Sequence, residues 1–177
     1  GAYYDGKTVS KAEENLLLYS QALATSPWVK QTAPVVVNNS AESPDGTITA
    51  TSITFTNQFS TVKQLVSTIG STSYTFSFYA KWVSGNTALR LLHEGSPTGT
   101  NTTFTATATW TRFSVTVLGS GSAIGFGIQD VNTSGFGEVL IWGAQLEQRP
   151  AVSSYQPTTT QPITLYQPTL LTASNNV

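Results

Sequence analysis

The segment Ser73–Trp82 alternates strictly between two kinds of side chain. Its even-numbered positions carry Tyr, Phe, Phe, Ala and Trp, whereas its odd-numbered positions carry Ser, Thr, Ser, Tyr and Lys. Because successive side chains of a β-strand point to opposite faces of a sheet, this pattern predicts a strand with one buried face. The segment therefore indicates one strand of a β-sandwich.

Further stretches of strand-forming residues lie between turn signals, at 15–21, 28–37, 48–56, 62–69, 88–93, 103–109, 112–118, 123–130 and 138–146. Pro34 interrupts one of them and places it at a sheet edge or a bulge, since proline cannot donate a ladder hydrogen bond. The sequence Pro44-Asp45-Gly46 predicts a tight turn. About ten short strands, with no amphipathic helix between them, predict an all-β fold, namely a jelly-roll-type β-sandwich.

Three regions follow from this pattern. Residues 1–14 form an N-terminal strap, in which Ser10 and Glu13 have the spacing of a helical capping box. Residues 15–147 form the sandwich, and residues 148–177 form an extended Pro-rich arm or linker, because repeated prolines favour extended backbone. A stiff linker and an arm docked on a neighbouring subunit both fit this region. The residues of such an assembly arm are Tyr155, Pro157, Leu165, Tyr166, Pro168, Leu170 and Leu171.

Composition narrows the function classes. Charged residues make up 10% of the chain and the net charge is −1, with no basic run. Nucleic-acid binding depends on clustered Lys and Arg, so we expect no nucleic-acid partner. The chain has no Cys and no apolar run of bilayer length, so we expect neither cysteine-based zinc sites nor membrane insertion. It also has no Met and begins at Gly1, which suggests a processed product or a piece of a longer protein.

The residues offer little catalytic chemistry. His93 is the sole histidine, which rules out His-pair metal motifs, and no Gly-x-Ser-x-Gly elbow surrounds any serine. The acidic residues fall mostly in turns, where solvation explains them better than the paired carboxylates of a glycosidase. We therefore expect a non-enzymatic protein without a cofactor. A structural calcium ion is the one metal left open, because calcium takes oxygen ligands from loops. The candidates for it are Glu13, Glu14 and Glu138.

One sheet face offers a candidate ligand site. On its strand Tyr79 points away from Phe76 and Phe78, and an exposed aromatic ring is a platform on which a sugar ring stacks. Core packing is the alternative for such a ring, and it is the favoured one both for the tryptophans and for Tyr79. Neighbouring strands are expected to add polar side chains to this face. The candidate ligand-binding residues are Tyr79, Lys81, Arg90 and His93.

A series of motifs resembles bacteriophage virion structural proteins of tails, fibres and head decorations. The series opens with AEENLLLYSQ, here ending at Gln21, and continues with a Trp, a PDGT turn and a YTFS-YAK strand. The series then includes, in the same order, a Trp-x-Arg, the sequence WGAQLE and a final Y-PTT segment. The matching positions are Tyr4–Gln21, Trp28, Pro44–Thr47, Tyr74–Lys81, Trp110–Arg112, Trp142–Glu147 and Tyr155–Thr159.

This resemblance covers nearly the whole chain, and modules of this kind are similar to the jelly roll of carbohydrate-binding modules. It implies a virion component located on the extracellular phage particle, acting through assembly contacts with other virion proteins or with copies of itself. The alternative is a host-glycan adhesion module of a tail fibre, which binds cell-surface glycan. The sequence leaves open the host, the glycan, the head or tail position and the oligomeric state.

Overall fold

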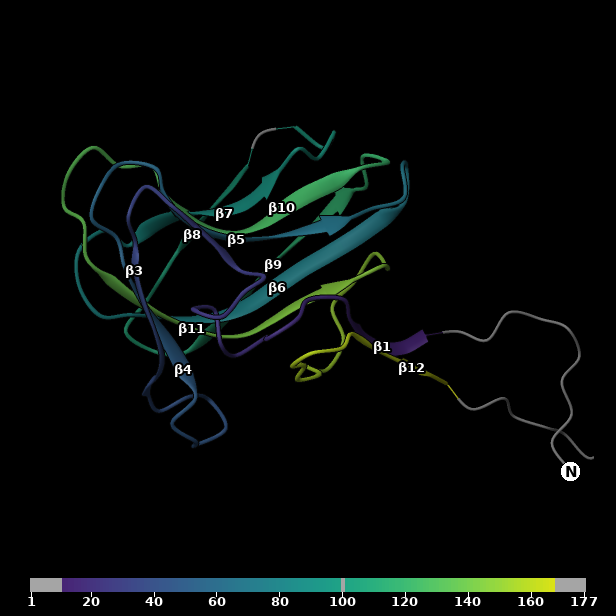
Figure 1. The fold of residues 1–177 in the computed structure, drawn as a ribbon, viewed down its shortest axis with the longest axis horizontal. Coiled ribbons are helices and arrows are strands. Elements are labelled where there is room, and N and C mark those ends of the chain that lie inside the picture. The colour runs from purple at the N-terminus through teal and green to yellow at the C-terminus, as the bar shows by residue number, and fades with distance from the viewer. Residues whose placement is uncertain (1–10, 100, 168–177) are drawn as a thin grey trace, which may run out of the picture.

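The computed structural model describes residues 11–99 and 101–167, and these form an all-β jelly-roll sandwich (Figure 1). One five-stranded sheet has the order β2-β5-β10-β7-β8 and the other has the order β3-β4-β11-β6-β9. A two-stranded ribbon of β1 and β12 lies at one end. The described residues contain no helix that is long and apolar enough to cross a membrane. The strands are β1 Lys11–Asn15, β2 Val29–Gln31, β3 Val35–Ala41, β4 Ala50–Thr54, β5 Ser60–Ser67, β6 Ser73–Trp82, β7 Ala88–Glu94, β8 Thr102–Thr105, β9 Thr111–Leu118, β10 Ala123–Asp130, β11 Glu138–Glu147 and β12 Ile163–Tyr166.

The core lies between the two sheets and is rich in phenylalanine. β6 runs over the predicted segment, and its even-numbered side chains enter the core as the alternation predicts. The ring of Phe76 lies 5.5 Å from that of Phe126 on the opposite sheet, and the ring of Phe78 lies 5.1 Å from that of Phe104. Burying each such side chain contributes about 1.5–3 kcal/mol, so these inter-sheet contacts hold the two layers together.

The prediction of one continuous strand at 28–37 is wrong. The structure divides it into β2 and β3, which belong to different sheets. Thr32 and Ala33, between them, have positive φ angles of 58° and 53°. These two left-handed residues turn the chain from one layer to the other, directly before Pro34. The break is therefore a sheet crossing rather than a bulge within one strand.

The N-terminal prediction also needs correction. The helical turn expected around Glu13 is absent, since Lys11–Asn15 is a strand paired antiparallel with β12. The pairing partner lies about 150 residues away in the chain, beyond the reach of a local capping signal; Ser10, the expected cap, lies outside the described residues. The strand expected at 15–21 is likewise replaced by an irregular segment, in which Tyr19 has a φ of 48°.

A single buried side chain joins three parts of the chain at this end. Asn15 is fully buried, and its amide nitrogen donates to the carbonyls of Ala144 and Gln156 at 2.9 and 2.8 Å. Its amide oxygen accepts from the backbone nitrogens of Leu17 and Leu146 at 3.0 and 3.2 Å. Asn15 therefore fixes the N-terminal segment and the C-terminal segment to the end of β11.

The segment that follows β11 lies on the sandwich itself. Across the outer face of the sheet that contains β6, Arg112 donates to the carbonyl of Ser153 and Thr75 donates to the carbonyl of Arg149, both at 2.8 Å. Tyr155 then packs on Trp142 with ring centroids 4.7 Å apart. We call residues 149–159 the strap from here on; this segment is different from the N-terminal strap predicted at residues 1–14. Its contacts lie within the same chain.

We expect Asn15→Ala to lower the free energy of unfolding by about 3 kcal/mol or more, because it leaves buried backbone donors and acceptors without partners. Asn57→Ala is the matched control, since Asn57 is exposed and, among the described residues, its side chain bonds only Thr56. Its effect should stay within about 0.5 kcal/mol. Urea unfolding of the three proteins measures both values. Equal stabilities would contradict the role given to Asn15.

Burial raises the pKa of the Tyr155 phenol to about 12, while its hydrogen bond with Ser20 acts in the opposite direction. Above pH 10 the unfolded phenol ionises and the folded one stays neutral, so stability is full below pH 10 and falls as the pH rises toward 12. We expect this loss to approach about 2 kcal/mol and to be absent in Tyr155→Phe. Unfolding free energies between pH 9 and 12 measure it. Parallel profiles for the two proteins would contradict the burial of this hydroxyl.

Candidate functional site

The outer face of the sheet β2-β5-β10-β7-β8 carries a layer of polar side chains over a strand of small residues. Val62, Phe126 and Leu91 point into the core, so the alternate residues of β5, β10 and β7 point outward. The register brings these outward residues together in rows across the three strands. The rows are Thr61–Gln129–Arg90, Lys63–Gly127–Leu92 and Leu65–Gly125–Glu94.

Two glycines leave the centre of this face without side chains. A Cβ atom added to Gly127 would lie 1.9 Å from the carbonyl oxygen of Val62, so no larger residue fits this backbone. A Cβ atom on Gly125 would lie 3.0 Å from Cδ of Lys63, whose stem occupies the space above it. A glycine inside a strand marks a close approach of another group. Here β10 makes room for side chains that reach over it from both neighbours.

The side chain of Lys63 extends from β5 across β10, the strand that contains Gly125 and Gly127, and reaches β7. Its ammonium lies 3.0 Å from the carboxylate of Glu94 on β7. The Lys63 side chain is 7% exposed and that of Glu94 is 56% exposed. The ion pair therefore has a buried cation and a solvent-facing carboxylate, which leaves the outer carboxylate oxygen accessible to donors from a ligand.

A second cross-strand link is a ladder of hydrogen bonds. Arg90 donates to the side-chain oxygen of Gln129 at 3.0 Å, and Gln129 donates to the hydroxyl of Thr61 at 2.8 Å. The three residues come from β7, β10 and β5. The ladder links the guanidinium and amide groups across the three strands, and the remaining donors of Arg90 stay available for other contacts.

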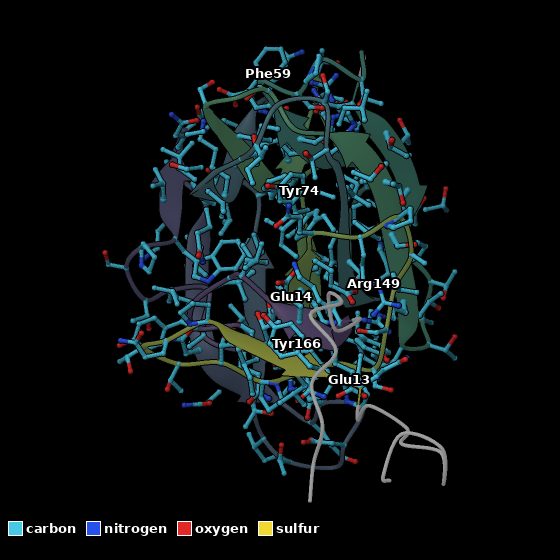
Figure 2. All side chains as sticks on the ribbon, turned by 90° about the vertical axis from the view of Figure 1, so that its right-hand side faces the viewer. Glu13, Glu14, Phe59, Tyr74, Arg149 and Tyr166 are labelled. Carbon is cyan, nitrogen blue, oxygen red and sulfur yellow. The ribbon has the colours of Figure 1, made fainter. Side chains whose placement is uncertain are left out.

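An exposed aromatic ring stands directly before β5. Phe59 is 49% exposed and has a φ of 67°, a left-handed conformation that costs a bulky residue about 1–3 kcal/mol. Its amide donates to the carbonyl of Asp130 at 2.7 Å, and Thr61 donates to the Phe59 carbonyl at 2.7 Å. Figure 2 shows Phe59 at the top of the molecule, away from the ribbon. Sequence reasoning missed this residue.

His93, one of the predicted ligand residues, faces the core. It follows Leu91 by two positions on β7 and is 2% exposed. Burial lowers the pKa of its imidazole, with a backbone hydrogen bond acting in the opposite direction. Its Nδ1 is buried without a hydrogen-bond partner in the described part of the chain. His93 is thus separated from Arg90, which lies on the outer face of the same strand.

Tyr79 and Lys81 lie on the other sheet, so the four predicted ligand residues do not form one face. Tyr79 points outward as expected, but its ring lies 5.5 Å from that of Trp142 and 5.4 Å from the Arg112 guanidinium. Tyr155 of the strap packs on the same Trp142. The aromatic rings on this face therefore contact one another and the strap.

The three candidate calcium ligands also lie apart. Glu138 begins β11 and accepts from Ser52 at 2.6 Å, whereas Glu14 lies beside the far end of that strand, where it pairs with Lys11 at 2.8 Å. Glu13 accepts from the side chain of Gln156. Among residues 11–99 and 101–167 there is no group of three or more His, Asp or Glu side chains that could hold a metal ion. Calcium binding stays a prediction.

The predicted arm residues fall into three groups. Tyr155 and Pro157 belong to the strap and lie against their own sandwich, while Leu165 and Tyr166 are on β12, 40% and 58% exposed. The remaining three residues, Pro168, Leu170 and Leu171, lie outside the described residues. The docking of this region on a neighbouring subunit stays a prediction.

No family model matches this chain, and no curated protein matches it. Solved structures do resemble it. The family 16 carbohydrate-binding module-2 aligns with a TM-score of 0.53 and 17% identity, covering 75% of this chain and 99% of that one. The family 11 carbohydrate-binding module of a cellulosomal cellulase of Clostridium thermocellum aligns with a TM-score of 0.52 and 13% identity, covering 79% and 97%.

A bacteriophage protein has the same arrangement. The enzymatically active domain of tailspike protein 4 from bacteriophage CBA120 aligns with a TM-score of 0.51 and 12% identity, covering 76% of this chain. The match spans 21% of the tailspike chain. At these identities the likeness concerns the fold alone, and it makes the chain a β-sandwich of the kind found in carbohydrate-binding modules.

Proposed function

We propose that this chain is a non-catalytic carbohydrate-binding module that holds a glycan against the outer face of the sheet β2-β5-β10-β7-β8. The observation that carries the proposal is the polar ladder of Arg90, Gln129 and Thr61, which lies beside the glycine positions of β10 with Phe59 at one end. The likeness to carbohydrate-binding modules of families 11 and 16 supports the same class of ligand.

The chemistry of this face suits a sugar chain. A sugar ring presents hydroxyl groups around its rim and C–H groups on its faces, so it needs polar partners beside a flat apolar surface. Arg90 and the exposed Glu94 carboxylate supply a donor and an acceptor, while Phe59 and the 56% exposed Leu65 supply apolar surface at the two ends of the row along β5. The ladder and the ion pair hold these groups in place before binding, which lowers the entropy cost.

The proposal extends to the place of action. The resemblance to virion structural modules and the likeness to a tailspike domain support a module that attaches an extracellular phage particle to cell-surface glycan. In that setting the module binds the sugar, and any hydrolysis belongs to other parts of the particle.

We expect Arg90→Ala to weaken glycan binding at least about tenfold, the worth of a lost charged hydrogen bond, while Lys81→Ala on the other sheet leaves affinity unchanged.

Phe59→Gly is the sharper variant. Glycine tolerates the left-handed φ, so this substitution should keep or raise thermal stability while it removes the ring and weakens binding. A glycan array, followed by calorimetric titration with the tightest-binding oligosaccharide, measures these effects. The proposal fails if no glycan is bound, or if Arg90→Ala and Phe59→Gly bind as tightly as the native protein.

Assembly is the second candidate function, and the ribbon is the observation that favours it. A two-stranded ribbon is marginally stable by itself, and β12, which among the described strands pairs only with β1, carries the exposed side chains of Leu165 and Tyr166. In this role the ribbon contacts another copy or another virion protein.

Light scattering tests this role. We expect the full chain to form a defined oligomer that dissociates in the double variant Leu165→Ser/Tyr166→Ser, with the sandwich still folded. Leu118→Ser, which alters an exposed leucine of β9 outside the ribbon, is the control and should leave the oligomer intact. Point variants are preferred to truncation after Glu147, because truncation removes the strap that packs on the sandwich. A monomeric native chain would exclude self-assembly through the ribbon.

A further inference from the structure

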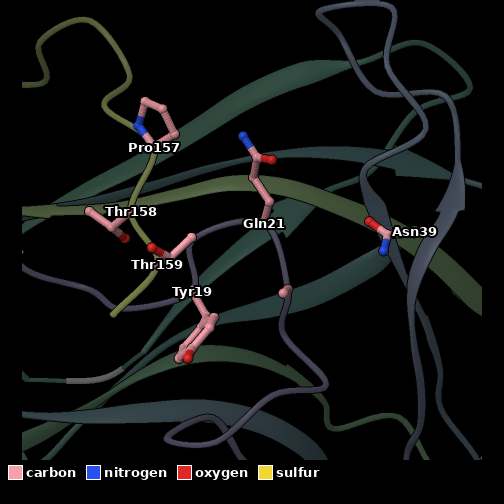
Figure 3. Close-up of a pocket in the computed structure, with 7 residues that line it drawn as sticks. Tyr19, Gln21, Asn39, Pro157, Thr158 and Thr159 are labelled. Carbon is pink, nitrogen blue, oxygen red and sulfur yellow. The ribbon is translucent and has the colours of Figure 1, made fainter. Parts of the chain in front are cut away.

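A pocket of about 240 Å³ lies where three distant segments of the chain meet (Figure 3). The segment after β1 supplies Tyr19, Gln21 and Ala22, and β3 supplies Asn39. The strap closes the pocket with Pro157, Thr158 and Thr159. β3 belongs to the sheet whose outer face the strap crosses, so the pocket is separate from the row of Arg90.

The strap side of this pocket is rigidly held. Thr158 donates through its hydroxyl to the carbonyl of Leu17 at 2.5 Å, and its amide donates to the hydroxyl of Ser20 at 2.8 Å. The amide of Tyr19 donates to the carbonyl of Thr159 at 2.9 Å. These bonds join residues more than 130 positions apart. The lining is therefore shaped before any ligand arrives, which reduces the ordering cost of binding.

Two lining residues have strained backbones. Tyr19 and Asn39 have φ angles of 48° and 51°. Asparagine tolerates this conformation, whereas for tyrosine it costs about 1–3 kcal/mol. Strain of this kind persists where the surrounding structure imposes it, and it concentrates at ligand sites. The conformation of Tyr19 places an aromatic side chain in the pocket wall.

The lining contains no charged side chain. The rings of Tyr19 and Pro157 and the methyl group of Ala22 supply apolar surface, while the amides of Gln21 and Asn39 and the hydroxyl of Thr159 supply neutral donors and acceptors. A charged ligand would lose its hydration here without gaining an opposite charge. A purely apolar ligand would leave the amides without partners.

We propose that this pocket is a second binding site, which takes one neutral sugar ring. The ring would stack on Tyr19 and bond the amides through its hydroxyl groups. The volume is below the roughly 300–1,000 Å³ of pockets for drug-sized ligands, so it suits a single ring rather than a chain of sugars. The site goes beyond the proposed glycan face and does not depend on it, because the two share no residue.

Saturation-transfer NMR with free glucose, galactose and N-acetylglucosamine at millimolar concentration tests the site. We expect at least one of the three sugars to bind, and Asn39→Gly and Thr159→Val each to weaken it about two- to tenfold, the worth of one hydrogen bond. Glycine preserves the left-handed φ of position 39, and valine preserves the shape of threonine. Ala22→Leu, which fills the pocket, should abolish binding.

The controls separate this site from the glycan face. Gln167→Ala removes an exposed amide outside the pocket and should leave the signal unchanged. Loss of the signal in Arg90→Ala together with retention in Asn39→Gly would assign the sugar to the glycan face and overturn the proposal. No transfer to any of the three sugars, with the protein shown to be folded by its amide spectrum, would also overturn it.

Discussion

The four hydrogen bonds of one buried amide tie the two ends of the described chain to the sandwich. Asn15 meets the end of β11 and the strap at the same point, and its four partners use its full hydrogen-bonding capacity. The ribbon, the strap and the small pocket all extend from this junction. Without it, the strap would lose the anchor that places Thr158 against the N-terminal segment.

The strap also gives the outer faces of the two sheets different roles. It crosses the outer face of the sheet that holds Tyr79 and Trp142, where it accepts hydrogen bonds from Thr75 and Arg112. That face is thus used for contacts within the chain. On the other sheet, the glycines of β10 let Lys63 reach Glu94, and the ladder from Arg90 runs parallel to that ion pair. The polar groups of that face are ordered by one another, and the Glu94 carboxylate among them is exposed to solvent.

The local alternation of side chains predicted the strands well wherever strand pairing is continuous. β6 and β10 coincide with their predicted segments, since alternation over eight or more residues reports a half-buried face directly. The failures occur where distant partners decide the outcome. β1 forms because β12 pairs with it, and the left-handed residues Thr32 and Ala33 separate β2 from β3. Neither signal is visible in a short window of sequence.

The candidate site was predictable only in part. Arg90 was among the predicted ligand residues and lies on the proposed face, but its expected neighbours Tyr79 and His93 lie on another sheet and on the opposite side of β7, because sequence does not show which sheet a strand joins. Gly125 and Gly127 were an available signal, since paired glycines inside a predicted strand indicate a close approach. Phe59 carried no such signal, and its exposure follows from a turn that only the folded chain defines.

The most direct measurement is an amide chemical-shift titration of the folded protein with the oligosaccharide that it binds most tightly. Shift changes concentrated on β5, β10 and β7 and on the turn at Phe59 are the predicted result. Changes confined to β6, β9 and the strap, or the absence of any change at saturating oligosaccharide, would contradict the assignment of the glycan face.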